Sequence, residues 1–309
     1  MEVDPVNVSS PQSGARPPRA GATQRGFKFA AGAAPRALKG LPLIWLCVFF
    51  VIPMCFIVVY SFAHAGFGTE KIGFTFENFD EALSGFNIEV FRRTLVFAVT
   101  GTLLCVVVAM PLAYFLARKA GRWAPVLIVL VLIPYITSFL IRTLSWRIIL
   151  TDNGPVADVL NALSLHSGPI HLLDAPPAVF IGVVYAYLPL MTLPLYVAFA
   201  RIPDEYLEAG RDLGAGGIRT FLSLTLPLAR PGIAAGVLLT AVPMTGEFVV
   251  PALLGGNKGV LMGGLISSQF LQVQNIPLGS AMAVLVLLVL GVVVLLLTRA
   301  TRGFDEVGA

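Results

Sequence analysis

The segment EYLEAGRDLGAGGIRTFLSLTLPLARPG, residues 205–232, is a polar interruption in a strongly apolar sequence. Eight charged residues lie between positions 201 and 230, whereas the flanking stretches 178–199 and 232–254 carry one charge between them. Burying even a few of these charges in hydrocarbon costs several kcal/mol. The segment is therefore predicted to lie outside the membrane that the two flanking stretches enter.

The composition of the whole chain indicates an integral membrane protein. Of its 309 residues, 57% are hydrophobic and 12% are charged, and the mean hydropathy is +0.85. Soluble globular domains have about twice that share of charged residues. A helix needs about 20 residues to cross a bilayer, and each of the longest apolar runs is close to that length. The sequence predicts an all-α, polytopic membrane protein with six transmembrane helices near residues 41–62, 94–117, 123–141, 178–199, 232–254 and 278–297.

The basic residues predict the orientation of these helices. If both termini are cytoplasmic, 15 of the 21 Lys and Arg lie on the cytoplasmic side and 6 lie outside. This asymmetry is the usual one for membrane proteins, so the net charge of +4 needs no nucleic-acid partner. We expect a multi-pass membrane protein with both termini in the cytoplasm. Its six-helix transmembrane domain is 41–299, with a disordered cytoplasmic tail at 1–40 and a short cytoplasmic tail at 300–309.

The cytoplasmic loop 201–231 has the pattern of two short helices. Residues 203–205, Pro-Asp-Glu, suit a helix start with acids in the first turn, and Gly214 suits its C-terminal cap. A second helix is expected at 218–225, ending before Pro227. Small side chains at Ala209 and Gly210 permit close approach of another backbone. Two interpretations remain open, namely a solvated connector and a docking element for a soluble partner.

The spacing within this loop resembles a known family. From Glu208, the order is Glu, Ala, a small residue, three residues, Gly214, nine residues, Leu224, one residue and Leu226-Pro227. This pattern resembles the EAA loop of ABC importer permeases, with Gly210 where a second Ala is common and Leu224 where Ile is common. The resemblance implies a coupling helix that seats in a groove of the ATP-binding subunit, formed by Glu208, Ala209, Gly210, Arg211, Asp212, Gly214, Leu226 and Pro227.

Three further segments resemble the spermidine/putrescine-type permeases, in particular the PotB branch. They are PLAYFLAR at 111–118, TSFLIRTLSWRIILTDNG at 137–154 and GEFVVPALLGG at 246–256. The resemblance implies that 41–299 is a type I ABC importer permease bundle of the bacterial inner membrane. This bundle would form half of a translocation pathway, with polyamines as the first substrate class. Importers of another small organic solute, such as an opine, a phosphonate or an amino-acid-like compound, remain the alternative.

The resemblance also implies the partners. No GxxxxGK[ST] phosphate-binding loop occurs in the sequence, so this chain is expected to be a transport subunit without its own ATPase and to bind no cofactor. ATP and Mg²⁺ belong to the partner. The expected complex holds a second homologous permease, two ATP-binding cassette subunits and an extracytoplasmic solute-binding protein, within membrane lipid and without nucleic acid.

The expected fifth helix contains the candidate substrate pathway. Pro243, Gly246 and Pro251 interrupt it, and interrupted helices within a membrane are tolerated where they face protein or a water-filled cavity. Glu247 lies at this interruption, and an ionisable group within a span indicates function. Together with aromatic rings it would suit an ammonium group, and the candidates are Phe248, Tyr185, Tyr187 and Tyr135. The alternatives are a hydrogen bond from Glu247 to a neighbouring helix and interfacial or packing roles for the tyrosines.

Arg142 and Trp146 follow the third expected span, four residues apart on one helix face. They are candidates for mutual stacking or for contact with a docked binding protein at the outer face, and an interfacial anchor is the alternative. His64, His166 and His171 lack metal-ligand spacing, so no metal site is expected.

Two functions of other classes compete with the importer. An ion-coupled secondary transporter predicts inverted repeats and several ionisable residues within the spans, whereas Glu247 is nearly alone and no repeat is evident. A membrane-bound enzyme requires converging acids, a nucleophile or a metal cluster, which the sequence does not contain.

Overall fold

The computed structural model describes residues 42–64, 73–163, 171–256 and 259–305, and every element in these ranges is a helix. The expected tail 1–40 and the last residues, 306–309, lie outside the described part. The chain divides after Ile52 into two units. The described part of the first is helical and includes a π-helical turn, η1 (Cys47–Val51). The second, from Pro53 onward, contains the core.

Four helices are long and apolar enough to cross a membrane, namely Pro42–Tyr60, Gly85–Arg118, Pro176–Ala200 and Ile276–Arg299. The first includes α2 (Ile52–Tyr60), the next two are α4 and α8, and the last belongs to α15 (Ile276–Asp305). Two further candidates are sharply bent helix pairs, so the described residues give six spans if each pair counts as one. The helix α4 begins nine residues before the expected start of the second span.

The first bent pair is α5 (Ala124–Ile136) and α6 (Phe139–Ile149), which meet at 92°. The span predicted for about 123–141 is therefore not one continuous helix, because it breaks at residues 137–138 near its C-terminal end. Thr137 and Ser138 adopt non-helical backbone angles. The carbonyl of Pro134, which the break leaves without a helical partner, accepts hydrogen bonds from Thr137 Oγ1 and Arg142 Nη1 at 2.7 and 2.8 Å.

The second bent pair joins the helical segment Gly217–Leu228 to α12 (Arg230–Thr245) at 70°. The predicted span 232–254 consists of α12 and a short helix, α13 (Val249–Leu254), separated by residues 246–248. The interruption predicted from Gly246 and its neighbouring prolines is confirmed, and Glu247 lies in the middle of it.

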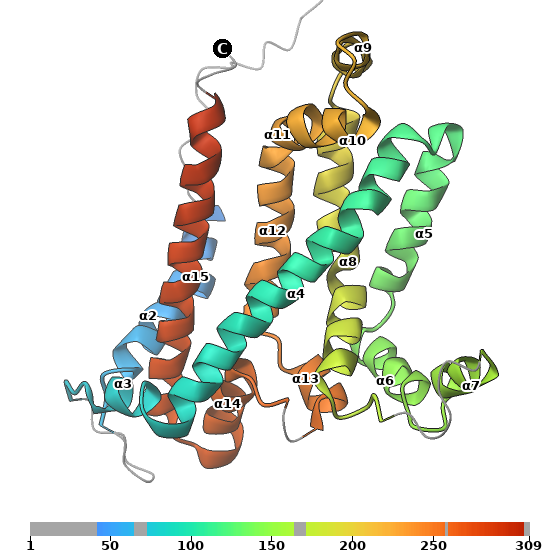
Figure 1. Cartoon of the computed structure of the whole chain (residues 1–309). Helices are drawn as coiled ribbons and strands as arrows, with labels where there is room; N and C mark the ends of the chain where they lie inside the picture. Colours follow the sequence, from blue (N-terminus) through green and yellow to red (C-terminus); the bar gives the residue numbers. More distant parts are fainter. Residues whose placement is uncertain (1–41, 65–72, 164–170, 257–258, 306–309) are drawn as a thin grey trace, which may run out of the picture. The chain divides into compact units, whose positions relative to one another are not determined.

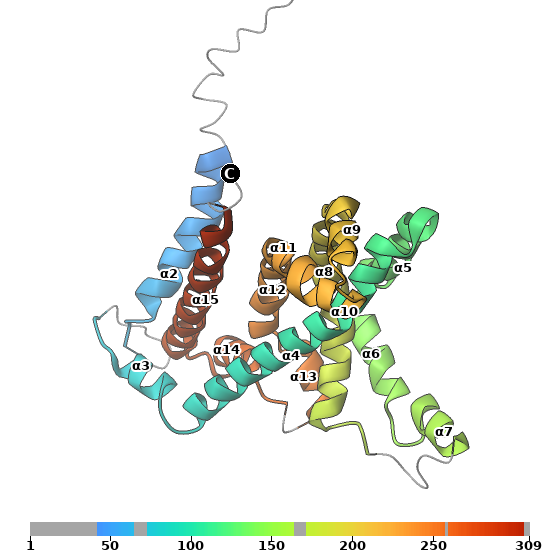
Figure 2. The same cartoon turned by 45° about the horizontal axis from the view of Figure 1, so that its top comes forward.

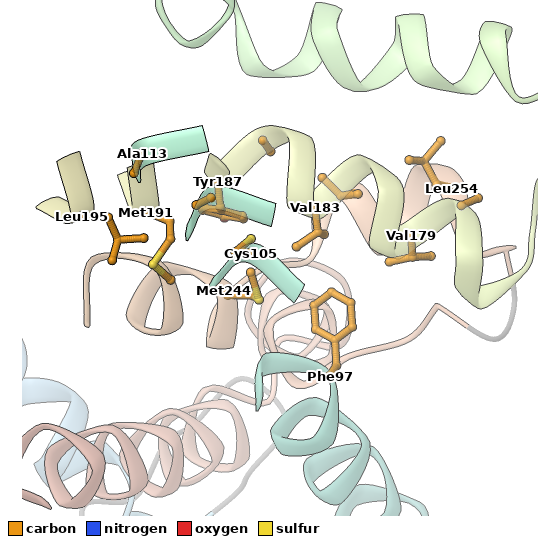
Figure 3. Close-up of a cluster of buried hydrophobic side chains, with 14 of the residues drawn as sticks. Phe97, Cys105, Ala113, Val179, Val183, Tyr187, Met191, Leu195, Met244 and Leu254 are labelled. Carbon is orange, nitrogen blue, oxygen red and sulfur yellow. The ribbon is translucent and has the colours of Figure 1, made fainter. Parts of the chain in front are cut away.

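The core of the second unit is formed where α4 and α12 pack on α8. Figure 3 shows Cys105 of α4, Val183 and Met191 of α8 and Met244 of α12, all fully buried, pointing toward one another. Small residues bring the backbones close: a Cβ added at Gly232 of α12 would lie only 2.2 Å from the Cβ of Ala198 of α8. Close backbone approach through small residues is the usual packing mode of helices in membranes.

Short helices lie at both ends of these long ones (Figures 1 and 2). At one end are α6, α7 (Pro155–Ala162), α3 (Glu77–Ala82), α14 (Met262–Ser268) and the π-helical turn η5 (Gln269–Val273). At the other end are α9 (Asp204–Asp212), α10 (Gly217–Thr220) and the 3-10 turn η2 (Gly121–Trp123), which joins α4 to α5. The polar loop thus shares one end of the bundle with the α4–α5 turn and the C-terminal end of α15.

Candidate functional site

The helix α9 forms as the sequence predicts. Pro203 precedes it in an extended conformation, and Asp204 and Glu205 occupy its first turn. Gly214 has φ +76° and donates to the carbonyl of Arg211 at 2.8 Å, while Ala215 donates to that of Gly210 at 3.0 Å. These paired bonds are a Schellman cap, and the left-handed backbone angle favours glycine at position 214.

The second arm of the loop differs from the prediction. The helix continues through Pro227 as α10, a π-helical turn η3 (Phe221–Thr225) and α11 (Leu226–Leu228). The amide of Leu226 bonds to the carbonyl of Phe221, five residues back. The wider π-helical turn directly precedes α11, and Pro227 lies in the first turn of α11. The expected stop before Pro227 is therefore wrong.

The loop's small residues serve the packing of the loop itself. A Cβ added at Gly210 would lie 3.3 Å from Thr220 Cγ2, so α9 and α10 approach closely at this point. Leu207 is buried and anchors α9. Leu226 and Pro227 are half-buried, whereas the outer surface of α9 exposes Glu208, Ala209, Arg211 and Asp212.

The loop also exposes large apolar side chains, which the sequence pattern did not single out. Leu213, at the end of α9, is 88% exposed, and Ile218, in α10, is 79% exposed. Exposed apolar side chains rimmed by charged ones are typical of protein interaction sites. We call the surface formed by Glu208, Ala209, Arg211, Asp212, Leu213 and Ile218 the coupling surface, after the role that the sequence resemblance implies for this loop.

A cavity of about 480 Å³ brings most of the pathway candidates together. Tyr135 of α5, Tyr187 of α8, and Glu247 and Phe248 of the α12–α13 break all line it. The rings of Tyr135 and Phe248 are exposed. Tyr185 is not in the lining but lies behind it, in contact with Arg142. The broken helices α5–α6 and α12–α13 therefore converge on one cavity.

The carboxylate of Glu247 is held at three points. Its Oε1 accepts hydrogen bonds from the amides of Val249 and Val250 at 2.8 and 3.2 Å, and its Oε2 accepts one from Tyr187 Oη at 2.6 Å. Glu247 is 6% exposed. Both roles left open by the sequence are thus compatible with its position, since it joins α8 to the helix break and also borders the cavity.

Arg142 lies in the wall of the same cavity and not on the outer surface expected from the sequence. It is 9% exposed, and its guanidinium lies 5.6 to 5.8 Å from the centroids of Tyr135, Phe139 and Tyr185. Its Nε has no hydrogen-bond partner among the described residues. Trp146 packs edge-on against Tyr185 at 5.3 Å, so both members of the expected pair contact that ring. The 92° bend carries Arg142 inward, which the sequence spacing did not reveal.

Arg118, the last residue of α4, is a further polar contact that sequence analysis missed. Its guanidinium donates to Asp204 Oδ1 at 2.7 Å and to the carbonyls of Phe199 and Ile202 at 2.7 and 2.6 Å. One side chain therefore joins α4, the end of α8 and the start of α9. The only local signal was a basic residue at the end of PLAYFLAR, which is also typical of any span at the cytoplasmic face.

Comparison with known proteins assigns the fold to a family. A family model described as the binding-protein-dependent transport system inner membrane component matches residues 29–302. The chain belongs to this family of transport permeases. Its relatives include the spermidine/putrescine transport system permease protein PotB of Escherichia coli (strain K12), 37% identical over 261 residues, which are 84% of this chain and 94% of that protein.

Solved structures of transporter chains show the same fold. A chain of a bacterial ABC transporter involved in the import of the acidic polysaccharide alginate aligns with a TM-score of 0.73 at 18% identity, covering 87% of this chain and 95% of that one. A chain of the alginate transporter in complex with an alginate pentasaccharide-bound periplasmic protein aligns with a TM-score of 0.71, also at 18% identity, covering 86% and 93%. The prediction of an all-α, multi-pass ABC permease bundle is confirmed.

Proposed function

We propose that this permease is a subunit of an ATP-driven importer of polyamines, with both termini in the cytoplasm. The observation that carries the substrate class is the 37% identity with PotB, a spermidine/putrescine transport permease, over most of both chains. The chemistry of the cavity agrees with it. A carboxylate and the exposed faces of Tyr135 and Phe248 are groups that attract alkylammonium ions.

In this proposal Glu247 provides the negative charge for one ammonium group. Three hydrogen-bond donors fix its orientation, and a carboxylate can accept about four hydrogen bonds in total, which leaves one site for a substrate N–H. Tyr187 holds the carboxylate in the cavity wall, so the charge is oriented before the substrate arrives. The second permease supplies the opposite half of the pathway.

The coupling surface is the proposed contact with the ATP-binding subunit. It combines charged side chains with the exposed Leu213 and Ile218, and such an apolar centre with a polar rim is typical of a protein interface. ATP and Mg²⁺ act on that partner and not on this chain. Closure of two ATP-binding subunits moves the loop, and the permease pair alternates between outward-open and inward-open states. A solute-binding protein delivers the substrate from outside.

One observation favours a second substrate class. Arg142 places a buried guanidinium with an unpartnered Nε in the wall that also holds Glu247. A zwitterionic solute would present an ammonium group to Glu247 and a carboxylate to Arg142, the pairing that guanidinium geometry favours. An amino-acid-like or opine solute is therefore the second candidate.

Competitive uptake distinguishes the two candidates. The permease is assembled with its co-encoded subunits in proteoliposomes, and ATP-driven uptake of labelled putrescine is measured against unlabelled spermidine or an opine. The proposal predicts that spermidine competes and the opine does not. Uptake of a labelled opine without uptake of putrescine would support the second candidate instead.

A further inference from the structure

The C-terminal turn of α4 makes two layers of contact with the loop that bears the coupling surface. In the polar layer, the Arg118 guanidinium binds the carbonyls of Phe199 and Ile202 and the carboxylate of Asp204, all at 2.6 to 2.7 Å. The Arg118 side chain is only 11% exposed, whereas that of Asp204 is 79% exposed. The polar layer thus joins α4 to the first residue of α9.

The aromatic layer lies one helical turn earlier on α4. Tyr114 packs edge-on against Phe199 of α8 at 5.7 Å and against Phe221 of η3 at 5.2 Å, and the two phenylalanine rings lie 6.1 Å apart. Tyr114 and Arg118 are four residues apart and share a helix face. Phe199 takes part in both layers, through its ring and through its carbonyl.

Both arms of the loop therefore meet the same turn of α4. The first arm arrives through Asp204 at the start of α9, and the second through Phe221 after α10. From this turn α4 runs through the core, where Thr102 Oγ1 contacts Met244 Sδ of α12 at 3.8 Å. Met244 lies three residues before Glu247. A continuous set of packed contacts thus connects the loop to the cavity.

We propose that Tyr114 and Arg118 form a positioning joint that transmits movement of the coupling surface to α4 and α8. The joint rests on the proposed ATP-driven function. A small displacement would break the hydrogen bonds of Arg118, because three hydrogen bonds from one planar guanidinium require a single relative placement of α4, α8 and α9. Movement of α9 is therefore passed to α4 and α8 and not absorbed by a flexible connection.

The strengths of the contacts predict a graded series of variants. Asp204→Asn removes the charge of a largely exposed partner but retains a side-chain oxygen that can accept from the guanidinium, so it weakens the polar layer least. Arg118→Lys retains the charge but loses the planar arrangement of donors. Arg118→Met retains the apolar stem and loses every donor, so the carbonyls of Phe199 and Ile202 both lose their bond to the guanidinium. Uptake per ATP hydrolysed should fall in this order, from Asp204→Asn to Arg118→Met.

The test uses the full complex in proteoliposomes and measures ATP hydrolysis and uptake in the same vesicles. For Arg118→Met we expect retention of the ATP-binding subunits and uptake per ATP lower by about tenfold, within the usual range of coupling between sites. The control is Arg122→Met, which removes an exposed guanidinium at the same end of the bundle that lies over Trp123. Unchanged uptake per ATP in Arg118→Met would overturn the joint.

A readout that needs no substrate separates this inference from the proposed function. Thr137 is exposed and lines the cavity, and the exposed Cys47 and Cys55 are first changed to Ser. A thiol reagent should then label Thr137→Cys at a rate that depends on ATP, and Arg118→Met should abolish that dependence. If the Thr137→Cys chain with Arg118 intact shows the dependence but moves no polyamine, the substrate proposal fails while the joint is still tested.

If the complex with Arg118→Met does not assemble, two milder variants test the joint instead. Arg118→Lys and Tyr114→Leu each weaken one layer only, and the joint predicts a smaller ATP-dependent change in Thr137→Cys labelling for both. A full change in both variants would overturn it.

Discussion

Glu247 and Tyr187 are joined by a 2.6 Å hydrogen bond from the phenol to the carboxylate, across the contact between α8 and the α12–α13 break. The two residues are 60 positions apart in the sequence. This bond fixes the carboxylate of Glu247 in the cavity wall, and the same carboxylate accepts hydrogen bonds from two backbone amides of α13. The Glu247 side chain therefore both stabilises the helix break and supplies a negative charge to the cavity wall.

Substitution of Glu247 by Gln should lower polyamine uptake while the complex still assembles. The amide oxygen can still accept from the α13 amides, whereas the negative charge is lost. We expect KM for putrescine to rise by about tenfold, the loss of one charge-assisted hydrogen bond. Tyr187→Phe is the matched control, since it retains the charge and removes only the orienting bond, so its effect should be smaller. An unchanged KM and rate of putrescine uptake in Glu247→Gln would show that Glu247 serves packing only.

Substitution of Arg142 by Met should separate the two substrate classes. The variant removes a positive charge from the cavity wall, so a dication should bind more tightly. We expect KM for putrescine to fall by about threefold, because water partly screens the repulsion between the guanidinium and the substrate ammonium groups. Arg142→Lys retains the charge and should leave KM nearly unchanged. A rise in KM for a labelled opine in Arg142→Met, restored in Arg142→Lys, would show that the transported solute pairs with this cation and would favour a zwitterion.

Reversal of charge at Glu208 should uncouple the permease from its ATPase. Glu208 is exposed on α9, so Glu208→Lys leaves the membrane helices intact. We expect retention of the ATP-binding subunits during purification to fall by at least about tenfold, because like charges across an interface cost several kcal/mol. Asp80→Lys, at the opposite end of the bundle on α3, is the control and should retain them. Normal retention and normal uptake in Glu208→Lys would remove the coupling assignment.

The cap at Gly214 should be required for the shape of the loop. At φ +76° an added Cβ costs about 1 kcal/mol, so Gly214→Ala should increase amide exchange in α9 by about fivefold. Gly216→Ala is the control, since Gly216 has φ −63° and no atom within 4 Å of an added Cβ. Equal exchange in the two variants would show that the left-handed angle is not needed.

Features determined by local sequence were predictable. The start of α9 follows from Pro203 and the acids after it, its end follows from Gly214, and the helix break at 246–248 follows from the glycine and its flanking prolines. Apolar length alone located the straight spans. The six-span, all-α bundle follows from these signals because a membrane restricts the chain to few solutions.

Features determined by distant contacts were not predictable. The inward position of Arg142 depends on a 92° bend at Thr137, whose backbone is fixed by bonds to the Pro134 carbonyl. The continuation of the helix through Pro227 depends on a π-helical turn that no local motif indicates. The role of Arg118 depends on carbonyls more than 80 residues away. Each requires tertiary packing that a single sequence does not display.

Uptake of labelled putrescine and spermidine tests the central claim most directly. The permease is placed in proteoliposomes with its co-encoded subunits, and accumulation is followed with and without ATP at the cytoplasmic face. The account predicts accumulation only with ATP, competed by unlabelled polyamine and lowered by Glu247→Gln. ATP hydrolysis without accumulation of either amine would contradict the polyamine assignment, and accumulation without ATP would contradict the ATP-driven mechanism.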